Sequence, residues 1–266
     1  MKQVLVTGGA GFIGSHLVDH LLSKGWRVRV IDNLRNGSLD RLQDASAQKG
    51  YEFLQRDILE MDACEEAVQG CDSVFHLACL GVRHSLHSPI ENHEVNARGT
   101  LNLLEACRAR APKSHFIYTS TSEVYGRVAQ FPISETALPV PMTVYGASKL
   151  VGEHYCTAYR ECFDLKTSVV RVFNNFGPRA HYEGDSGEII PRAIVRLLQG
   201  EAPIVFGDGK VTRDFFYVKD TASALAEVDE HSALQNQILN IGTGAEMTMK
   251  LVTEKILEAM GEKRDR

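Results

Sequence analysis

The chain has 266 residues, of which 44% are hydrophobic and 24% are charged, and its formal net charge is −5. This composition is ordinary for a folded globular protein, and the absence of a lysine/arginine block gives no reason to expect a nucleic-acid partner. No apolar run approaches membrane-spanning length, and the first residues enter an expected strand without a signal-peptide pattern. The six cysteines lack C-x-x-C spacing. We therefore expect reduced thiols, no bound metal, no membrane partner and a cytoplasmic location.

The first strand leads into a glycine-rich segment. The run Lys2–Thr7 is apolar and β-rich, and a helix is expected from Phe12 to Leu22. Between them and into the helix come three glycines in G-x-x-G-x-x-G spacing: Gly8, Gly11 and Gly14. Glycines permit a sharp turn and close approach to a pyrophosphate, and the helix N-terminus offers free N–H groups to it. This order predicts a dinucleotide-binding site.

The second strand indicates which dinucleotide is bound. It is expected at 27–31 and ends in Asp32, eighteen residues after Gly14. A carboxylate at this place can accept hydrogen bonds from a ribose 2′-OH and would repel a 2′-phosphate. The sequence therefore predicts NAD in preference to NADP.

Short β-rich runs alternate with helical stretches through the first two thirds of the chain. Strands are expected near 3–6, 27–31, 51–54, 73–77, 115–119 and 167–172, with long helices near 88–110 and 143–163. Parallel strands need helix-length connections, and those helices cover both faces of the sheet. The pattern predicts an α/β fold of the Rossmann type, with a doubly wound parallel sheet.

After Arg171 the pattern is less regular. Strands near 203–206 and 238–241 are mixed with helices near 189–199, 219–229 and 248–260. We expect residues 1–172 to form the NAD-binding domain, and residues 173–266 to form a smaller substrate-binding lobe interleaved with the end of the sheet. The last helix stops six residues before the end of the sequence, so we expect this lobe to be truncated or naturally short.

A tyrosine and a lysine are spaced four residues apart in the segment Tyr145-Gly-Ala-Ser-Lys149. Positions i and i+4 share one face of a helix, so the ammonium of Lys149 can lie near the phenol of Tyr145. A nearby cation favours the phenolate and lowers a pKa that is about 10 in water. Such a tyrosine can act as a base towards a hydroxyl while a hydride leaves the same carbon for a nicotinamide. We predict that both residues are catalytic.

Several further motifs accompany these two. In chain order they are Thr7–Gly14 (TGGAGFIG), Asp57-Ile58, His76-Leu-Ala78, Asn96 with Gly99-Thr100, Thr119–Gly126 (TSTSEVYG), Tyr145 with Lys149, Arg171–Pro178 (RVFNNFGP) and Phe206–Phe215 (FGDGKVTRDF). In this combination the chain resembles the extended short-chain dehydrogenase/reductases, specifically the NAD-dependent nucleotide-sugar epimerases and dehydratases. The resemblance covers nearly the whole chain, and it implies NAD as cofactor and a nucleoside-diphosphate sugar as substrate.

The resemblance also implies which residues hold the cofactor. Asp57 and Ile58 would contact the adenine, and the segment after His76 would line the diphosphate and the nicotinamide ribose. The implied cofactor residues are Gly8, Gly11, Phe12, Ile13, Gly14, Asp32, Asn33, Asp57, Ile58, Leu77, Ala78, Tyr145 and Lys149.

For the substrate, Thr121 resembles the hydroxyl residue that hydrogen-bonds the sugar 4-oxygen beside Tyr145. Asn174 is similar to the asparagine that meets the nucleotide diphosphate. Arg213 occupies the place of the arginine that clamps the diphosphate, a role that suits its planar fork of donors. Ser122 is the remaining expected substrate contact.

Glu123 bears on the reaction type. Simple 4-epimerases of this family usually carry a small or hydroxylated residue there, whereas dehydratases and some decarboxylases carry glutamate. After oxidation at C4 the C5 proton becomes acidic, and a carboxylate within reach can remove it as general base. The pair Ser122-Glu123 stands where 4,6-dehydratases often have Asp-Glu, and the same pair occurs in the GDP-mannose dehydratases and the UDP-glucuronate decarboxylases. The expected catalytic residues are thus Thr121, Glu123, Tyr145 and Lys149.

The favoured function is an NAD-dependent enzyme that converts a nucleoside-diphosphate sugar through a 4-keto intermediate, as a 4,6-dehydratase. The alternatives are a 4-epimerase, then a UDP-glucuronate decarboxylase-like enzyme, then a non-catalytic NAD-binding protein. The resemblance further implies a homodimer through the helices near 89–110 and 143–163. Apolar residues such as Leu101, Leu104 and Val151 are expected to supply part of its buried surface.

Overall fold

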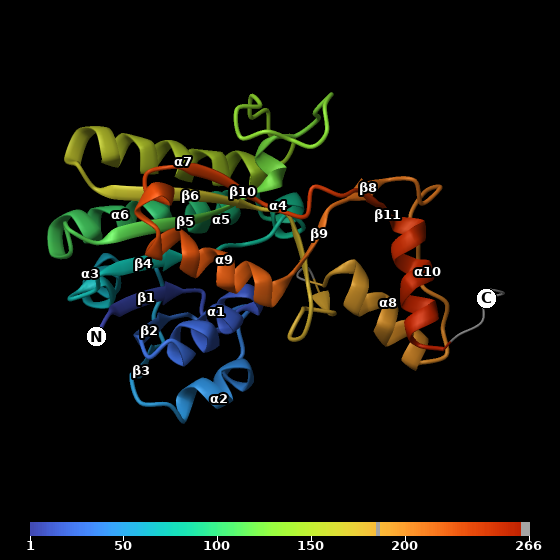
Figure 1. The fold of residues 1–266 in the computed structure, drawn as a ribbon, viewed down its shortest axis with the longest axis horizontal. Helices are drawn as coiled ribbons and strands as arrows, with labels where there is room; N and C mark the ends of the chain where they lie inside the picture. Colours follow the sequence, from blue (N-terminus) through green and yellow to red (C-terminus); the bar gives the residue numbers. More distant parts are fainter. Residues whose placement is uncertain (185–186, 262–266) are drawn as a thin grey trace.

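The computed structural model describes residues 1–184 and 187–261. Within them the central layer is a seven-stranded sheet with the strand order β10-β6-β5-β4-β1-β2-β3, and every pairing in it is parallel (Figure 1). Its strands are β1 (Gln3–Thr7), β2 (Arg27–Ile31), β3 (Tyr51–Leu54), β4 (Ser73–His76), β5 (His115–Thr121), β6 (Lys166–Val172) and β10 (Ile238–Ile241). This confirms the predicted Rossmann-type α/β fold.

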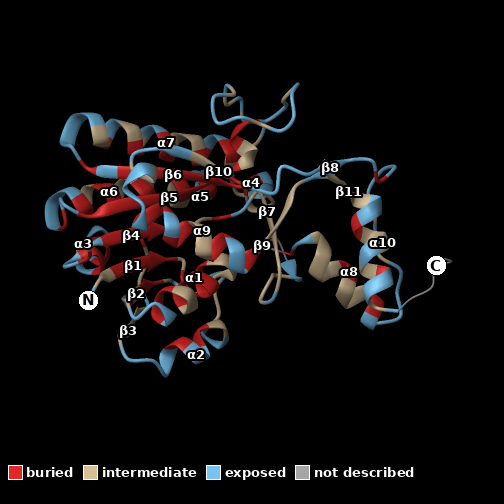
Figure 2. Cartoon of the chain, in the orientation of Figure 1, coloured by how far each residue is buried: buried red, intermediate tan, exposed pale blue. Residues whose placement is uncertain are grey.

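Helices cover both faces of the sheet, and each face has its own apolar core. On one face α1 (Phe12–Ser23) packs against α9 (Val218–Glu230), with the short α2 (Gln43–Ser46) beside α1. On the other face α6 (Gly99–Arg110) lies between α3 (Met61–Val68) and α7 (Val144–Phe163). Successive residues of a strand point to opposite faces, so the strand β1 contributes to both cores. Figure 2 shows the buried residues concentrated along the strands and the helix surfaces that cover them.

The strand order reverses beside β1, which pairs with β2 on one side and with β4 on the other. In open α/β sheets ligands bind at such a switch point, outside the carboxyl ends of the strands. The glycine-rich segment leaves β1 at Thr7, and the segment Leu77–Ala78 leaves β4 at the same edge because Thr7 and His76 are in register. The topology therefore places both segments at the expected ligand site.

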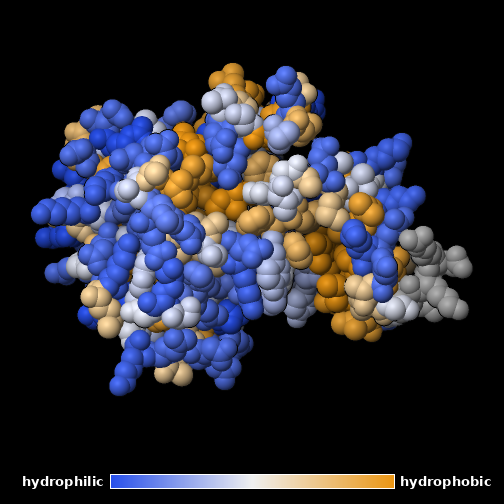
Figure 3. All heavy atoms as spheres, viewed as in Figure 1, coloured by the Kyte–Doolittle hydropathy of each residue, from blue (hydrophilic) through white to orange (hydrophobic). Residues whose placement is uncertain are grey.

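The last third of the chain contributes both to the sheet and to a separate lobe. β10 pairs with β6, and α9 covers the sheet beside α1. In the lobe α8 (Ile189–Leu198) packs against α10 (Met249–Ala259). Its short strand pairs are β7 (Asn174–Phe176) with β9 (Phe215–Tyr217), and β8 (Thr212–Arg213) with β11 (Met247–Thr248). Figure 1 shows α8 and α10 set apart from the sheet, and Figure 3 shows apolar surface gathered over them.

The strand expected near 203–206 is wrong. These residues have no regular structure, and the side chains of Ile204 and Phe206 are 53% and 83% exposed. A β-rich sequence forms a strand only where a neighbouring strand can pair with it, and here β8 pairs with β11 instead. Four short strands of the lobe, β7, β8, β9 and β11, were not expected from the sequence.

The single helix expected over 88–110 is three segments. After the short helix α4 (His84–His87), α5 (Pro89–His93) passes into a π-helical turn at Glu94–Arg98, which continues as α6. π-Helical turns often occur at functional sites. Here the turn carries Asn96, whose side-chain amide donates to the carbonyl of Leu80 (3.0 Å) and accepts from its N–H (2.8 Å). The irregular turn therefore supports the loop that follows β4.

Of the three apolar side chains expected at the dimer surface, two are partly exposed and could contact a second copy, and one is buried. Leu104 is completely buried in the core between α6 and the sheet, so it cannot supply an interface with a second copy. Leu101 and Val151 are only partly buried. The sequence did not reveal which face of α6 would be turned towards the sheet.

In the part of the chain that the structure describes, no helix combines the length and apolarity needed to cross a membrane. The six cysteines are all free, and Cys64, Cys71, Cys107 and Cys156 are buried.

Candidate functional site

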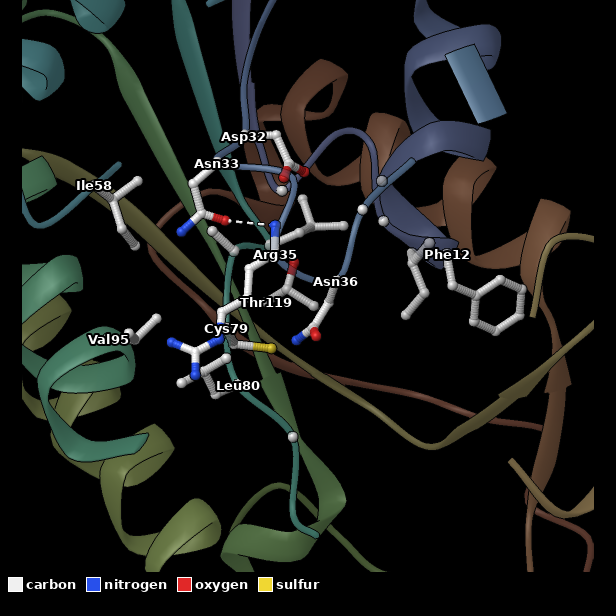
Figure 4. Close-up of a pocket in the computed structure, with 18 of the residues that line it drawn as sticks. Phe12, Asp32, Asn33, Arg35, Asn36, Ile58, Cys79, Leu80, Val95 and Thr119 are labelled. Atoms are coloured by element: carbon white, nitrogen blue, oxygen red, sulfur yellow. Dashed lines mark hydrogen bonds between the residues drawn. The ribbon is translucent and has the colours of Figure 1, made fainter. Parts of the chain in front are cut away.

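A first cavity of about 340 Å³ opens at the carboxyl ends of β1, β2 and β4, within the size range of ligand sites in proteins. The structure brings every expected cofactor residue to its lining: Gly8, Gly11, Phe12, Ile13, Gly14, Asp32, Asn33, Asp57, Ile58, Leu77, Ala78, Tyr145 and Lys149. Figure 4 shows Asp32 and Asn33 at one edge of this cavity, Phe12 on another side, and Ile58 and Val95 opposite.

The glycine-rich turn leaves no space for side chains. Gly8 has a positive φ of 69°, and a Cβ there would lie 2.7 Å from the backbone nitrogen of Ala78. A Cβ on Gly14 would lie 2.2 Å from the carbonyl oxygen of Gly8. α1 begins after Gly11, which supplies no side-chain cap, so the N–H groups of its first turn are free of intrahelical partners. This close, donor-rich backbone fits the pyrophosphate of a dinucleotide.

The end of β2 is tied to the neighbouring loops by two polar side chains. Asp32 accepts hydrogen bonds from the N–H groups of Ala10 (3.0 Å) and Leu34 (2.8 Å). Burial raises the pKa of Asp32, and these two donors oppose the rise because they stabilise the carboxylate. Asn33 donates to the carboxylate of Asp57 (2.8 Å). Asp32 and Asp57 thus both line the cavity next to the end of β2.

A buried polar chain fixes the segment after β4. The hydroxyl of Thr7 contacts Nδ1 of His76 (2.7 Å), and Nε2 of His76 contacts the hydroxyl of Thr100 (2.9 Å). The Thr7 hydroxyl also accepts from the N–H groups of Leu77 (3.2 Å) and Ala78 (3.1 Å). Burial holds the pKa of His76 well below its usual value, so the ring stays neutral. The side chains of Thr7, His76 and Thr100 therefore fix the backbone that forms this wall of the cavity.

Tyr145 and Lys149 lie one turn apart on α7, whose N-cap Thr143 accepts a hydrogen bond from the N–H of Gly146 (3.0 Å). Burial raises the pKa of Tyr145, and a hydrogen bond with Thr121 opposes the rise. Lys149, only 2% exposed, places its ammonium 4.4 Å from the ring centre of Tyr118. The sequence-based expectation of a lowered Tyr145 pKa is wrong for this structure, because burial dominates. The expected proximity of Thr121 to Tyr145 is present.

A second cavity, of about 810 Å³, adjoins the turn after β5 and extends into the lobe. Four further expected site residues line it, Ser122, Glu123, Asn174 and Arg213, whereas Thr121 is in the lining of neither cavity. The backbone N–H of Glu123 donates to the Thr121 hydroxyl (3.2 Å), and this bond fixes the start of the turn. The backbone N–H of Asn174 donates to the carbonyl of Asp214 (3.1 Å), so β7 and β9 set the position of its side chain.

A buried ion pair supports the strand end and turn that carry Thr121 and Glu123. The carboxylate of Glu153 on α7 lies 2.6 Å from the guanidinium of Arg171 on β6, and both side chains are 3% exposed. Arg171 also donates to the hydroxyl of Tyr125 (2.8 Å), and Tyr125 donates to the side chain of Asn240 on β10 (2.7 Å). One polar network therefore joins α7, β6 and β10 to the turn between the two cavities.

The structure adds cavity residues that the sequence did not single out. Figure 4 shows Arg35, Asn36 and Cys79 projecting into the first cavity from the loops after β2 and β4. Glu188, at the start of α8, lines the same cavity from the lobe. The Asn-Gly pair at position 36 is a turn pattern that could have indicated a loop, but no local pattern marks Glu188. Within the described residues no cluster of His, Cys, Asp or Glu is arranged to hold a metal.

The geometry defines a Rossmann-type, nucleotide-binding fold. Tyr145 and Lys149 line its first cavity, and a second, larger cavity adjoins the turn after β5. The sequence profile of the NAD dependent epimerase/dehydratase family matches residues 4–242. The chain belongs to this family, and NAD is its cofactor.

Three similar proteins illustrate the range of this family. The UDP-N-acetyl-alpha-D-glucosaminuronate decarboxylase of Bacillus cytotoxicus is 38% identical over 96% of this chain and 79% of its own length. The crystal structure of the Thermotoga maritima UDP-glucose 4-epimerase with UDP-glucose superposes with a TM-score of 0.92, at 34% identity over 99% of this chain and 84% of that one. The dTDP-glucose 4,6-dehydratase of Streptomyces venezuelae, with NAD bound, gives a TM-score of 0.92 at 30% identity, covering 98% and 82%.

Proposed function

We propose that this enzyme converts a nucleoside-diphosphate sugar through a 4-keto intermediate, with the nucleotide sugar in the second cavity and NAD in the first. The observation that carries the proposal is the position of Tyr145 between them. Tyr145 lines the first cavity, while its hydrogen-bond partner Thr121 begins the turn whose Ser122 and Glu123 line the second. A sugar held there can present its 4-hydroxyl to the phenol.

The roles of the chain's residues follow from this arrangement. When bound, NAD supplies a site that accepts a hydride from sugar C4 and later gives it back. Tyr145 takes the proton of the 4-hydroxyl, Thr121 holds the same oxygen, and the buried ammonium of Lys149 offsets the negative charge that forms on the phenol. Asn174 and Arg213, which also line the second cavity, bind the diphosphate.

The reaction that Glu123 supports is 4,6-dehydration. Glu123 lines the second cavity in the turn that begins at Thr121, so its carboxylate can face the carbon next to a C4 held at Tyr145. Once C4 is a ketone, Glu123 removes the C5 proton, and the C6 hydroxyl leaves with a proton as water. Return of the hydride to C6 and of a proton to C5 gives a 4-keto-6-deoxy sugar nucleotide. The dehydratase from Streptomyces venezuelae has the same fold.

A second candidate is 4-epimerisation, in which the hydride returns to the opposite face of C4 and no C5 proton moves. The similarity to the Thermotoga maritima epimerase supports it equally well. Tyr145, Lys149 and Thr121 would keep the roles given above, and Glu123 would only shape the sugar site.

The products separate the candidates. The NAD-loaded protein is incubated with UDP- and dTDP-linked hexoses and with UDP-glucuronate in deuterated water, and the nucleotide sugars are analysed by mass spectrometry and NMR. Dehydration gives a product lighter by one water with deuterium at C5, whereas epimerisation gives an unchanged mass and no carbon-bound deuterium. A product that has lost carbon dioxide from a uronate, or no product at all, contradicts both candidates.

A single substitution tests the role of Glu123. In a dehydratase Glu123→Gln still permits oxidation at C4 but stalls before elimination, so reduced cofactor accumulates while product formation nearly stops. Glu246→Gln is the matched control, because Glu246 lines the same cavity and its carboxylate accepts from Thr212 (3.0 Å) away from Tyr145. The control should keep turnover within a few-fold. Full turnover of Glu123→Gln without reduced cofactor would favour the epimerase.

We also propose that two copies associate through α6 and α7. The partly buried Leu101 and Val151 on these helices, together with Ile90, which is 80% exposed on α5, offer apolar surface for such a contact. Light scattering at micromolar concentration should give twice the mass of one chain, and Ile90→Asp should shift the mass towards that of a monomer. A strict monomer for the unmutated protein would contradict the proposal.

A further inference from the structure

Three consecutive residues at the end of β5 carry hydroxyl groups, and their hydrogen-bond partners differ. The Ser120 hydroxyl donates to the carboxylate of Glu153 (2.5 Å), and the Thr121 hydroxyl accepts from the N–H of Glu123 (3.2 Å). The hydroxyl oxygen of Thr119 is buried and has no hydrogen-bond partner among the residues that the structure describes. A buried polar group without a partner destabilises a fold and is rare in native proteins. This hydroxyl therefore calls for an explanation.

The unpartnered hydroxyl belongs to a residue in the wall of the first cavity. Thr119 lines that cavity together with Tyr145 and Lys149, and Figure 4 shows its side chain among the sticks that surround the cavity. The residue is only 7% exposed, so the cavity is where a further partner can reach it. A threonine hydroxyl has one hydrogen to donate and two lone pairs that accept. A polar group of a ligand in this cavity would supply the missing hydrogen bond.

The position of β5 in the sheet indicates which part of a dinucleotide the hydroxyl meets. The glycine-rich turn that fits the pyrophosphate follows β1, and Asp32, expected at the adenosine ribose, follows β2. In the order β5-β4-β1-β2, the strand β5 lies on the opposite side of β1 from β2. Adjacent strands are about 4.8 Å apart, so β5 is about 10 Å from β1. A dinucleotide whose adenosine lies towards β2 must extend its nicotinamide riboside towards β4 and β5.

We propose that Thr119 is a positioning residue for the cofactor, and that its hydroxyl forms a hydrogen bond with the nicotinamide riboside of NAD. The inference rests on the proposed function, because it requires NAD to occupy the first cavity. Thr119 is two residues from Thr121, and side chains two apart along a strand point to the same face. One face of β5 thus carries a hydroxyl for the cofactor next to the hydroxyl expected at the sugar 4-oxygen.

The test measures the affinities of ADP, ADP-ribose and NAD by calorimetry. Thr119→Val replaces the hydroxyl by a methyl group of similar size, and should weaken NAD about fivefold or more, because a ligand group loses its partner inside the cavity. Affinity for ADP, which lacks the nicotinamide riboside, should stay within about twofold. A loss that is already present with ADP-ribose assigns the contact to the ribose, and a loss with NAD alone assigns it to the nicotinamide. Thr119→Ser keeps the hydroxyl and should bind NAD nearly as tightly as the unmutated protein.

Thr167→Val is the matched control. Thr167 is a buried threonine of β6 that lines neither cavity, and its hydroxyl donates to the carbonyl of Cys156 (2.9 Å). Its substitution should lower the melting temperature of the NAD-free protein, because a formed hydrogen bond is lost, and should leave the affinity for NAD unchanged. Thr119→Val should not lower the melting temperature, because it removes a hydroxyl that has no partner. A merely structural role for Thr119 would give the pattern of the control.

Asp32→Ala separates failure of this inference from failure of the proposed placement of NAD. If Asp32→Ala weakens both ADP and NAD while Thr119→Val leaves the affinity for NAD within twofold, the inference is overturned and the placement stands. Equal losses of ADP and NAD in Thr119→Val would also overturn it, because they would show a general distortion of the cavity. If neither substitution changes the affinity for NAD, the inference and the placement are both contradicted.

Discussion

The two cavities are assembled in different ways. The first is made mainly by loops that leave neighbouring parallel strands, and most of its lining residues follow β1, β2 and β4 within a few positions of the strand end. The second joins segments from residue 122 to residue 246 through side-chain contacts, such as the Asp214 carboxylate that accepts from Thr243 and Gly244. A local motif can therefore define the cofactor site, whereas the substrate site exists only after the lobe has packed against the sheet.

If NAD binds in the first cavity and the sugar nucleotide in the second, a substitution at Tyr145 should have the largest effect on turnover and the smallest effect on NAD binding. Tyr145→Phe removes one oxygen and should lower kcat about 10²- to 10⁴-fold, the usual loss for a positioned acid/base group. The amount of NAD bound should remain nearly unchanged. Turnover is measured with the sugar nucleotide identified by mass spectrometry, and NAD by calorimetry. Activity within a few-fold of the parent would place the base on another residue.

The polar network beneath the turn should affect stability, whichever ligand is present. Glu153→Gln leaves Arg171 buried without its counter-charge and should lower the free energy of unfolding by about 3–5 kcal/mol. Urea denaturation followed by circular dichroism measures this change. Glu161→Gln is the control, because Glu161 is 68% exposed in its ion pair with Arg160 and should leave the midpoint unchanged. Equal effects of the two substitutions would mean that the buried ion pair contributes no more to the free energy of unfolding than the exposed one.

A change confined to the first cavity should weaken NAD and leave the second cavity intact. Asp32→Ala removes the acceptor for the ribose hydroxyls and for two backbone N–H groups. Since a hydrogen bond to a charged group contributes roughly 1.5–3 kcal/mol, NAD should bind about 10- to 100-fold more weakly. Calorimetry with NAD measures this, and titration with UDP should show unchanged affinity. Tighter binding of NADP than of NAD by the unmutated protein would contradict the role of Asp32.

The smallest effect on activity is expected from a substitution at Asn174, which lines the second cavity. Asn174→Ala removes a neutral amide whose hydrogen bond to a diphosphate would contribute about 0.5–1.5 kcal/mol, so KM should rise about 2- to 10-fold. The value of kcat should stay nearly constant, because the proposed role of this residue is to bind the diphosphate and not to move a proton. Steady-state kinetics separates the two constants. A fall in kcat with an unchanged KM would show that Asn174 does not bind the ground state of the substrate.

The sequence predicted the sheet, and it selected residues that line one common cavity, because both depend on local pattern. Short β-rich runs indicated each strand of the central sheet, and the glycines with Asp32 indicated one rim of the first cavity. The same reasoning produced a strand near 203–206, because β-rich composition does not reveal whether a partner strand is present. It also assigned Leu104 to a surface, since a helix that is apolar on more than one side does not reveal which side faces the sheet.

The residues that were missed share one property, which is that their position depends on tertiary contacts. Glu188 lines the first cavity only because the lobe helix α8 begins beside it, and Arg83, more than one hundred positions earlier in the sequence, donates to the carbonyl of the preceding Gly187. The pKa of Tyr145 was misjudged for a related reason. Spacing revealed the neighbouring Lys149, but the burial that raises the pKa of Tyr145 becomes visible only in three dimensions.

The return of the chain to the sheet has a consequence for any attempt to shorten this protein. β10 lies at the end of the sheet and covers the open backbone groups of β6, while α9 covers one apolar face beside α1. A fragment that stops at Val172 would retain the whole glycine-rich turn, yet it would expose an unpaired edge strand and a bare hydrophobic surface. Such edges invite pairing between molecules. The fragment should therefore aggregate rather than serve as an independent dinucleotide-binding unit.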